Sequence, residues 1–163
     1  PLVLSNCPDA RFKLIGEGHL RDRIESEIRR LNVEDKVTLK PWIPHDHLPS
    51  YIKKMKLLVL PSYSEGIPGV VQEAMACGTV VLATPVGGVP DLIRHRETGY
   101  VLENNSPDCI AGCVTKALND STLNTIARNA RLFVENNYNY DVTVERYRKI
   151  LLKLSAKKRK LVS

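Results

Sequence analysis

Residues 57–83, LLVLPSYSEGIPGVVQEAMACGTVVLA, decide the fold class. The run over residues 57–61 lacks the alternation of a half-buried strand and is typical of a strand buried on both faces. A helix is predicted over residues 69–77, because Pro68 suits a helix start, where its missing N–H would have no intrahelical partner anyway. The apolar run over residues 80–83 then predicts a second strand. A strand, a helix and a strand in this order favour a parallel sheet with helices on its faces.

The rest of the chain repeats this alternation of apolar runs and amphipathic segments. One helical segment carries the acid–base pairs Arg21/Glu25 and Arg23/Glu27 at i, i+4 spacing, which stabilises a helix. Further strands are predicted over residues 12–16, 37–39 and 99–102, and further helices over residues 20–31, 48–55 and 89–93 and in three pieces after Ser106, broken near residues 120 and 136–140. The expected fold is therefore α/β, a Rossmann-like parallel sheet with helices on both faces, in a single domain over residues 1–163.

Composition and charge are those of a globular domain. Hydrophobic residues make up 43% and charged residues 26% of the chain, and no apolar run approaches the roughly 20 residues that span a bilayer. No signal-peptide pattern opens the chain, and it is the few, scattered cysteines that make the cytoplasm the expected location. Part of the net charge of +6 lies in the tail KKRK at residues 157–160. This tail is either a solvated terminus or a contact with an anionic membrane surface at its inner face, and no nucleic-acid-binding module is present.

Four cysteines are too few and too scattered for a disulfide framework, which favours a reducing compartment. Cys109 and Cys113 are spaced i, i+4 on a predicted helix, so two metal ligands are conceivable there. No histidine or aspartate at ligand spacing completes such a set. We therefore interpret both cysteines as buried thiols and expect no metal site.

Ligands of open parallel sheets bind at the carboxyl ends of the strands, so the loops after residues 15, 39, 60 and 83 should line one rim. The first loop holds Gly16 and Gly18, but Arg21 occupies the third position of the glycine-rich dinucleotide motif, which is therefore incomplete. These two glycines either let a backbone approach a ligand closely or make a tight turn. The pair Gly87-Gly88 leaves the same two options open in the last of these loops.

The loop after residue 60 leads into a predicted anion site. The helix begins near Pro68 or Gly69, so the N–H groups of Gly69 and Val70 have no intrahelical partner, and the positive end of the helix dipole points into the rim. Glu65 stands in the loop before this start, and Glu73 lies about 6 Å beyond it, roughly one helical turn. Carboxylates accept pairs of hydrogen bonds from sugar hydroxyls, so the arrangement suits a ligand with a sugar on each side of its phosphates.

Spacing alone favours a simpler interpretation, in which both glutamates complement the helix dipole and face water. A glycosidase pair of carboxylates is a further alternative, although it explains the intervening anion site poorly. His45 and His47 flank Asp46 beside the rim and invite a metal site. A third ligand is missing from the sequence, so a polar helix start is favoured there.

Five stretches stand in the order and spacing of a known family: FKLIGEGHLRDRIE, VTLKPWIP, LLVLPSYSEGIPGVVQEAMACG, VVLATPVGGVPDLI and ETGYVLENNSPD. They resemble the C-terminal half of the group 1 glycosyltransferases, retaining enzymes of the GT-B type that use nucleotide-diphosphate sugars. The resemblance covers about residues 9–147. It implies a domain that binds the donor while the whole enzyme transfers a hexose, with retention, to a saccharide or lipid-linked acceptor. It also implies no cofactor and no metal besides the nucleotide-sugar substrate.

The resemblance assigns roles to individual residues. Glu65 matches the first acid of the family's E-x7-E motif, which contacts the transferred sugar, and is the expected catalytic residue. Glu73 matches the second acid, which holds the ribose hydroxyls. The residues expected to bind the donor are Gly16 and Gly18 beneath it, Trp42 and Ile43 at the nucleobase, Gly66, Ile67, Gly69 and Val70 at the diphosphate and sugar, and Glu73 at the ribose.

The chain departs from the family at three places, one of them a neutral change in a turn, where Thr79 stands in the place of the family's usual proline. Ile67-Pro68 stands where the family often has Phe-Gly, which removes one backbone donor beside the phosphates. The family's domain also begins with a strand and a basic G-R-x(n)-K-G loop that clamps the diphosphate, and neither precedes Asp9. We therefore expect a partial domain without its first strand, separated from the N-terminal acceptor domain of the same protein and inactive alone. A non-catalytic nucleotide-sugar-binding module and a GT-B epimerase stay open as alternatives.

A C-terminal helix and the basic tail are expected from about residue 141. This helix places Tyr147, Ile150, Leu151 and Leu154 on one stripe. In the family, the terminal helix crosses back onto the N-terminal domain. Part of the stripe is therefore expected to be exposed or to contact a neighbour.

Overall fold

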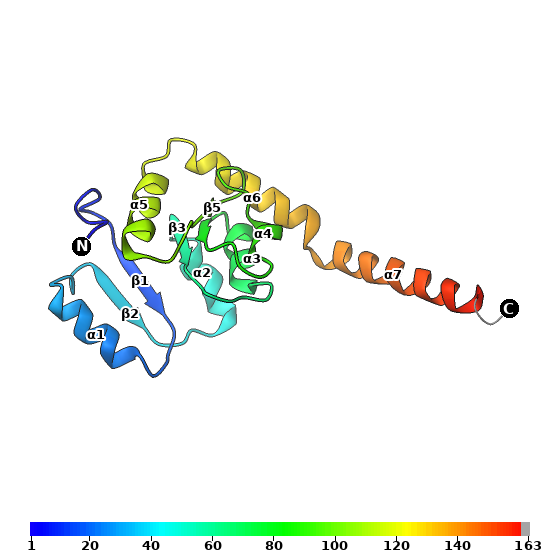
Figure 1. Cartoon of the computed structure of the whole chain (residues 1–163), viewed down its shortest axis with the longest axis horizontal. Coiled ribbons are helices and arrows are strands. Elements are labelled where there is room, and N and C mark those ends of the chain that lie inside the picture. The colour runs from blue at the N-terminus through cyan, green and yellow to red at the C-terminus, as the bar shows by residue number, and fades with distance from the viewer. Residues whose placement is uncertain (161–163) are drawn as a thin grey trace.

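The computed structural model describes residues 1–160, with side chains through residue 155. Strands and helices alternate along the chain as predicted (Figure 1). The strands are β1 (Phe12–Ile15), β2 (Val37–Lys40), β3 (Leu57–Leu60), β4 (Val80–Ala83) and β5 (Tyr100–Val101). The helices are α1 (Arg21–Arg30), the 3-10 helix η1 (His45–His47), α2 (Leu48–Ile52), α3 (Gly69–Ala76), α4 (Val89–Leu92), α5 (Pro107–Leu118), α6 (Leu123–Asn137) and α7 (Tyr140–Lys160).

The strand pairs over residues 1–160 are all parallel, as the alternation of strands and helices predicts. β1 pairs with β2, with Phe12 opposite Val37, whereas β3, β4 and β5 form a second sheet in that order. The chain passes from β2 to β3 through η1 and α2, and no described strand joins the two sheets (Figure 1). β1 and β3 therefore each keep one edge without a strand partner in this part of the chain.

β4 is the central strand of the second sheet, and all four of its residues are buried. Successive side chains of a strand point to opposite faces. Val81 and Ala83 accordingly belong to one apolar cluster with residues of α2, α3, α4 and α6. Val80 and Leu82 belong to a second cluster with residues of α5 and the first turn of α6. The prediction of helices on both faces is thus confirmed, and each buried Val or Leu contributes about 1.5–3 kcal/mol to folding.

The prediction that β3 is buried on both faces holds only in part, because both faces pack against apolar clusters but neither is fully buried. Its four residues are only half-buried, in contrast to those of β4. β3 lies at the edge of its sheet, so its side chains have strand neighbours on one side only. An unbroken apolar run cannot report whether a strand is central or at an edge, because that depends on which other strand pairs with it.

α1 lies on β1 and β2 more loosely than its apolar spacing predicts. None of its residues is buried, and Leu14 of β1 is 41% exposed. An apolar groove of about 600 Å³ lies between α1, β1, α5 and residues 1–4. The predicted Arg21–Glu25 ion pair forms at 3.0 Å. Glu27 pairs with Arg30, at i, i+3, instead of with Arg23, since both spacings bring side chains together on a helix.

The three C-terminal helices break where the sequence predicts. The hydroxyl of Ser106 accepts a hydrogen bond from the N–H of Cys109, so it caps α5 as expected. α7 projects away from the rest of the domain (Figure 1), and Ile150 and Leu151 are 55% and 63% exposed. The prediction of an exposed stripe is confirmed, whereas the basic tail lies outside the described side chains. No helix described here combines the length and apolarity that a membrane crossing requires.

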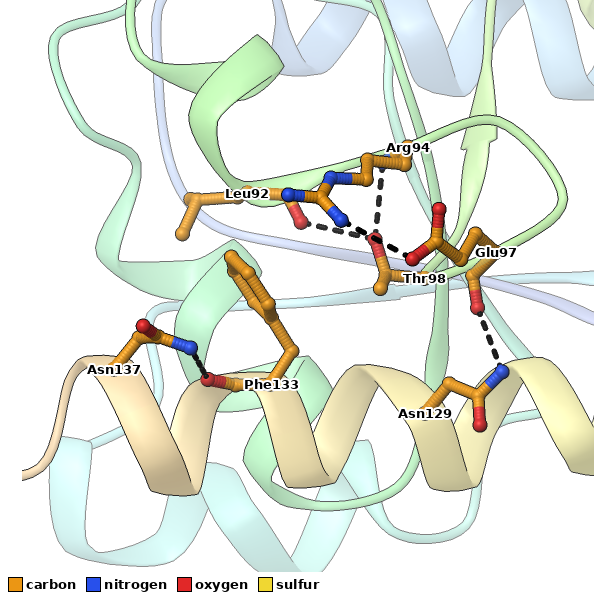
Figure 2. A network of polar contacts seen from close by, with 7 residues as sticks. All are labelled: Leu92, Arg94, Glu97, Thr98, Asn129, Phe133 and Asn137. Carbon is orange, nitrogen blue, oxygen red and sulfur yellow. Dashed lines mark hydrogen bonds and ion pairs between the residues drawn. The ribbon is translucent and has the colours of Figure 1, made fainter.

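A polar network fixes the turn between α4 and β5 onto α6 (Figure 2). The buried hydroxyl of Thr98 donates to the carbonyl of Leu92 and accepts from the N–H of Arg94, both at 3.0 Å. From α6, the side-chain amide of Asn129 donates to the carbonyl of Glu97 at 3.2 Å. The Arg94 guanidinium lies over the ring of Phe133, 5.8 Å from its centroid. These contacts hold the start of β5 in place beside β4.

Asp120 forms a second network between α5 and α6. Its carboxylate accepts hydrogen bonds from the N–H and hydroxyl of Thr122 and, at 2.9 Å, from the phenol of Tyr100. The Arg96 guanidinium lies 3.0 Å away. The bonds from Thr122, then that from Tyr100 and the nearby Arg96 charge, lower the pKa of Asp120 from 3.8 to about 2. Burial and the bond to Asp120 raise the pKa of Tyr100 to about 12, so its phenol stays a donor at neutral pH.

We expect Asp120 to stabilise the fold only where it is ionised. Because its pKa is lower in the folded state than in the unfolded state, its contribution is complete above about pH 4 and is lost as the pH falls toward 2. Asp120→Asn should therefore lower the stability to urea at pH 7 and reduce its loss between pH 4 and 2. The exposed Asp9→Asn variant is the control. If Asp120→Asn and the unmutated protein lost the same amount of unfolding free energy between pH 4 and 2, this assignment would be contradicted.

Candidate functional site

The loops after the strands approach one another along a rim, as predicted. The N–H of Gly16 donates to the carbonyl of Lys40 at 3.1 Å, which joins the ends of β1 and β2. The N–H of Gly88 donates to the carbonyl of Gly66 at 2.6 Å, which joins the loop after β4 to the loop after β3. A side-chain contact between η1 and α3, described below, connects the two sheets along the same edge. The carboxyl ends of the strands therefore share one rim.

The glycine pair after β4 serves a close approach of one backbone to another. Gly87 has a φ of +55°, and a Cβ placed on it would lie 1.9 Å from the carbonyl oxygen of Glu65. A Cβ on Gly88 would lie 2.8 Å from Cγ1 of Ile67. The structure gives these glycines a role that neither option named, a close approach to the loop that carries Glu65. Gly87 and Gly88 thus set the position of that loop.

α3 begins where the sequence predicts. Pro68 precedes the helix with an extended backbone (φ −72°, ψ 110°), and no side chain caps the start. The N–H of Val71 reaches the carbonyl of Pro68 at 3.1 Å. The N–H groups of Gly69 and Val70 lie in the first turn, where no helical carbonyl stands three or four residues before them, so they are free to bind a ligand anion at the positive end of the dipole.

The other predicted donor-binding residues lie in loops of the rim. Trp42 is 66% exposed and Ile43 is half-buried in the loop after β2. Gly16 has a φ of +141°, a conformation that side chains rarely adopt, and a Cβ on Gly18 would meet no atom within 4 Å. Gly16 is therefore required for the backbone turn, whereas Gly18 leaves open space. The side chain of Glu65 is half-buried in the loop before α3.

Glu73 points back toward the start of its own helix. Its Oε1 atom lies 3.9 Å from the position that a Cβ on Gly69 would take. The same atom lies 2.9 Å from Nε2 of His45, on η1. The hydrogen bond and the negative charge of Glu73 raise the pKa of the His45 imidazole, and the nearby Asp46 acts in the same direction. The carboxylate is thus held beside the anion site, with Oε2 left to accept further hydrogen bonds.

Sequence reasoning did not find the contact of His45 with Glu73. The predicted polar helix start at residues 45–47 is confirmed, since these residues form η1. The two partners are 28 positions apart on different elements, so no local spacing signals their contact. Only the packing of η1 and α2 beside α3 brings them together.

The cysteines are free, and Cys109 and Cys113 pack against an apolar cluster but are only half-buried, not buried as predicted. Burial raises the pKa of the Cys113 thiol, and the neighbouring Cys109 adds to this effect. Over the described residues, no group of three or more His, Cys, Asp or Glu side chains is placed to hold a metal ion.

Comparison with known proteins places the chain in a family. Residues 2–151 match the model of the glycosyl transferases group 1. An uncharacterised glycosyltransferase of Methanocaldococcus jannaschii is 32% identical over 148 residues, which cover 90% of this chain and 42% of the relative. The structure of sucrose-phosphate synthase from Thermosynechococcus elongatus matches with a TM-score of 0.83 and 28% identity over 95% of this chain and 41% of that protein. A variant of S. aureus TarM, solved with fondaparinux, α-GlcNAc-glycerol and UDP, matches with a TM-score of 0.80 and 26% identity over 91% of this chain and 30% of that protein.

Fold and rim together define a Rossmann-like α/β domain whose ligand loops lie at the carboxyl ends of its strands. This chain belongs to the group 1 glycosyl transferases, and the resemblance read from its motifs is confirmed. The chain spans about two fifths of the length of that first relative, 42%.

Proposed function

We propose that this chain is the donor-binding domain of a retaining glycosyltransferase. The whole protein transfers a hexose from a nucleotide-diphosphate sugar to a saccharide or lipid-linked acceptor. One observation carries the proposal: the uncapped start of α3 lies between Glu65 in the loop before it and Glu73, whose carboxylate folds back toward Gly69. UDP is the first nucleotide to test, because TarM of S. aureus was solved with UDP.

The proposed binding mode follows the chemistry of the rim. The diphosphate lies at the N–H groups of Gly69 and Val70, where backbone donors and the helix dipole both favour an anion. Glu73 accepts hydrogen bonds from the ribose hydroxyls, and Glu65 contacts the transferred sugar. Trp42 and Ile43 line the place of the nucleobase. The proposal includes no resident metal or other cofactor.

We also propose that a further part of the protein completes the site. A parallel strand between β1 and β3 would satisfy the edge that each of them leaves without a strand partner. Basic residues from outside this chain would balance the diphosphate charge, and an N-terminal domain would bind the acceptor. This chain by itself would then bind donor weakly and transfer no sugar, because neither substrate alignment nor charge stabilisation is complete.

Replacing Glu73 by Ala tests the ribose contact. We expect donor affinity to fall by about 10- to 100-fold, since hydrogen bonds to a charged group contribute about 1.5–3 kcal/mol. A thermal-shift screen of nucleotides, beginning with UDP, first selects the nucleotide sugar. Titration calorimetry of the whole protein with that nucleotide sugar then measures the change in affinity. The exposed Glu34→Ala, in the turn after α1, is the matched control. Equal affinity in Glu73→Ala and the unmutated protein would return Glu73 to the role of a solvated acid at a helix start.

A further inference from the structure

A side-chain hydrogen bond joins η1, which follows β2, to α3. The Nε2 atom of His45 and the Oε1 atom of Glu73 are 2.9 Å apart, although 28 positions separate the two residues. The His45 side chain is 76% exposed and that of Glu73 is 31% exposed. The resemblance to the E-x7-E motif implies a role for the glutamate and none for the histidine.

His45 is held in place by its own turn. The N–H of His47 donates to the carbonyl of Pro44 at 2.9 Å, and the N–H of Leu48 donates to the carbonyl of His45. Leu48 in turn packs against the apolar core beneath α3. The imidazole is therefore presented from an anchored backbone, and Ile43, at the proposed nucleobase position, lies only two residues before it.

Glu73, by contrast, has several rotatable bonds and a partly exposed side chain. Without a partner, its carboxylate would sample several rotamers around the first turn of α3. A hydrogen bond from Nε2 uses one lone pair of Oε1 and leaves Oε2 and the remaining lone pairs as acceptors. The bond thus selects one orientation of the carboxylate, over the start of α3. The carboxylate can still accept hydrogen bonds from hydroxyl groups.

We propose that His45 is a positioning residue for the donor: it holds the Glu73 carboxylate in the orientation that receives the ribose hydroxyls. This inference rests on the proposed role of Glu73 in donor binding. It also connects the nucleobase segment to the ribose-binding acid, so that one rigid unit, η1 with its neighbours, orients two parts of the same ligand. Because Nε2 donates both in the charged imidazole and in the tautomer protonated at Nε2, the contact does not require a charged histidine.

Nucleotide binding to the whole protein tests the inference. A screen of UDP, GDP, ADP, CDP and dTDP selects the probe that binds the unmutated protein, and its affinity is then measured for four variants: His45→Ala, His45→Gln, Glu73→Ala and the His45→Ala/Glu73→Ala double variant. We expect His45→Ala to weaken binding by about two- to fivefold, the range for an exposed charged contact. Gln restores a donor near the Nε2 position, so His45→Gln should recover most of the affinity. In the Glu73→Ala background, His45→Ala should cause no further loss, because the histidine acts through the carboxylate.

The outcomes separate this inference from the proposed function. If Glu73→Ala leaves the nucleotide affinity unchanged, or if no diphosphate in the screen binds the unmutated protein, the proposed role of Glu73 is wrong. The inference about His45 is then wrong as well. If Glu73→Ala weakens binding while His45→Ala matches the unmutated protein or binds more tightly, only the inference is overturned. Equal losses from His45→Ala in both backgrounds would also overturn it. His47→Ala, on the same exposed turn, controls for general damage, together with unchanged melting temperatures.

Discussion

Glu65→Ala is expected to lower sugar transfer by the whole protein by about 100- to 1000-fold while changing nucleotide affinity little. The proposed contact of Glu65 is with the transferred sugar, where charge develops during the reaction, and removing one such stabilising group has effects of this size. Steady-state kinetics with a saturating nucleotide sugar should therefore show the loss in kcat. Calorimetry with the nucleotide alone should show little change.

Two variants make the Glu65 result specific. Glu65→Gln keeps the shape of the side chain and removes its charge, so a comparable loss of kcat would point to the charge itself. Glu97→Ala removes a carboxylate from the exposed turn between α4 and β5. This turn is not one of the rim loops, so the variant should leave kcat unchanged. Unaltered transfer by correctly folded Glu65→Ala would show that Glu65 has no part in catalysis. A matching loss of nucleotide affinity would instead place it at the nucleotide.

The sequence predicts those features of the fold that depend on neighbouring residues. The helix start at Pro68 and Gly69 follows from the geometry of proline, and the cap at Ser106 follows from its hydroxyl. The alternation of strands and helices predicts parallel pairing, which every pair over residues 1–160 shows. These predictions succeed because the causes act over a few residues or over one connection.

Features that depend on distant partners were not predictable in the same way. The burial of β3 depends on which strand lies beside it. The contact of His45 with Glu73 arises because η1 and α2 pack next to α3. The motif thus supplies the acids of the candidate site, whereas tertiary packing supplies the side chain that contacts one of them.

Gly87 shows how tertiary packing also controls the other acid. The sequence leaves open whether the glycine pair approaches a ligand or merely turns. In the structure, the backbone of Gly87 lies against the carbonyl of Glu65, and its φ of +55° is one that residues with a Cβ adopt at a cost of about 1–2 kcal/mol. The position of Glu65 is therefore determined by a residue more than 20 positions later in the chain.

Gly87→Ala should consequently impair both stability and transfer. Its Cβ would lie 1.9 Å from the carbonyl oxygen and 2.7 Å from the carbonyl carbon of Glu65, so one of the two loops has to move. We expect a loss of about 2–4 kcal/mol in unfolding free energy, from the φ penalty and the displaced backbone together. A displacement of about 1 Å at a substrate-aligning group can cost about 100-fold in rate, so kcat should fall by a similar factor.

The control for Gly87→Ala is a glycine that has space and an ordinary backbone. Gly112 lies within α5, and a Cβ there would meet no atom within 4 Å. Gly112→Ala should raise stability by about 1 kcal/mol through helix propensity and leave transfer unchanged. Urea unfolding and kcat, measured for both variants, compare the same chemical change at two sites. If Gly87→Ala behaved like Gly112→Ala, the loop after β4 would have no part in placing Glu65, and the position of the acid would have to be set within its own loop.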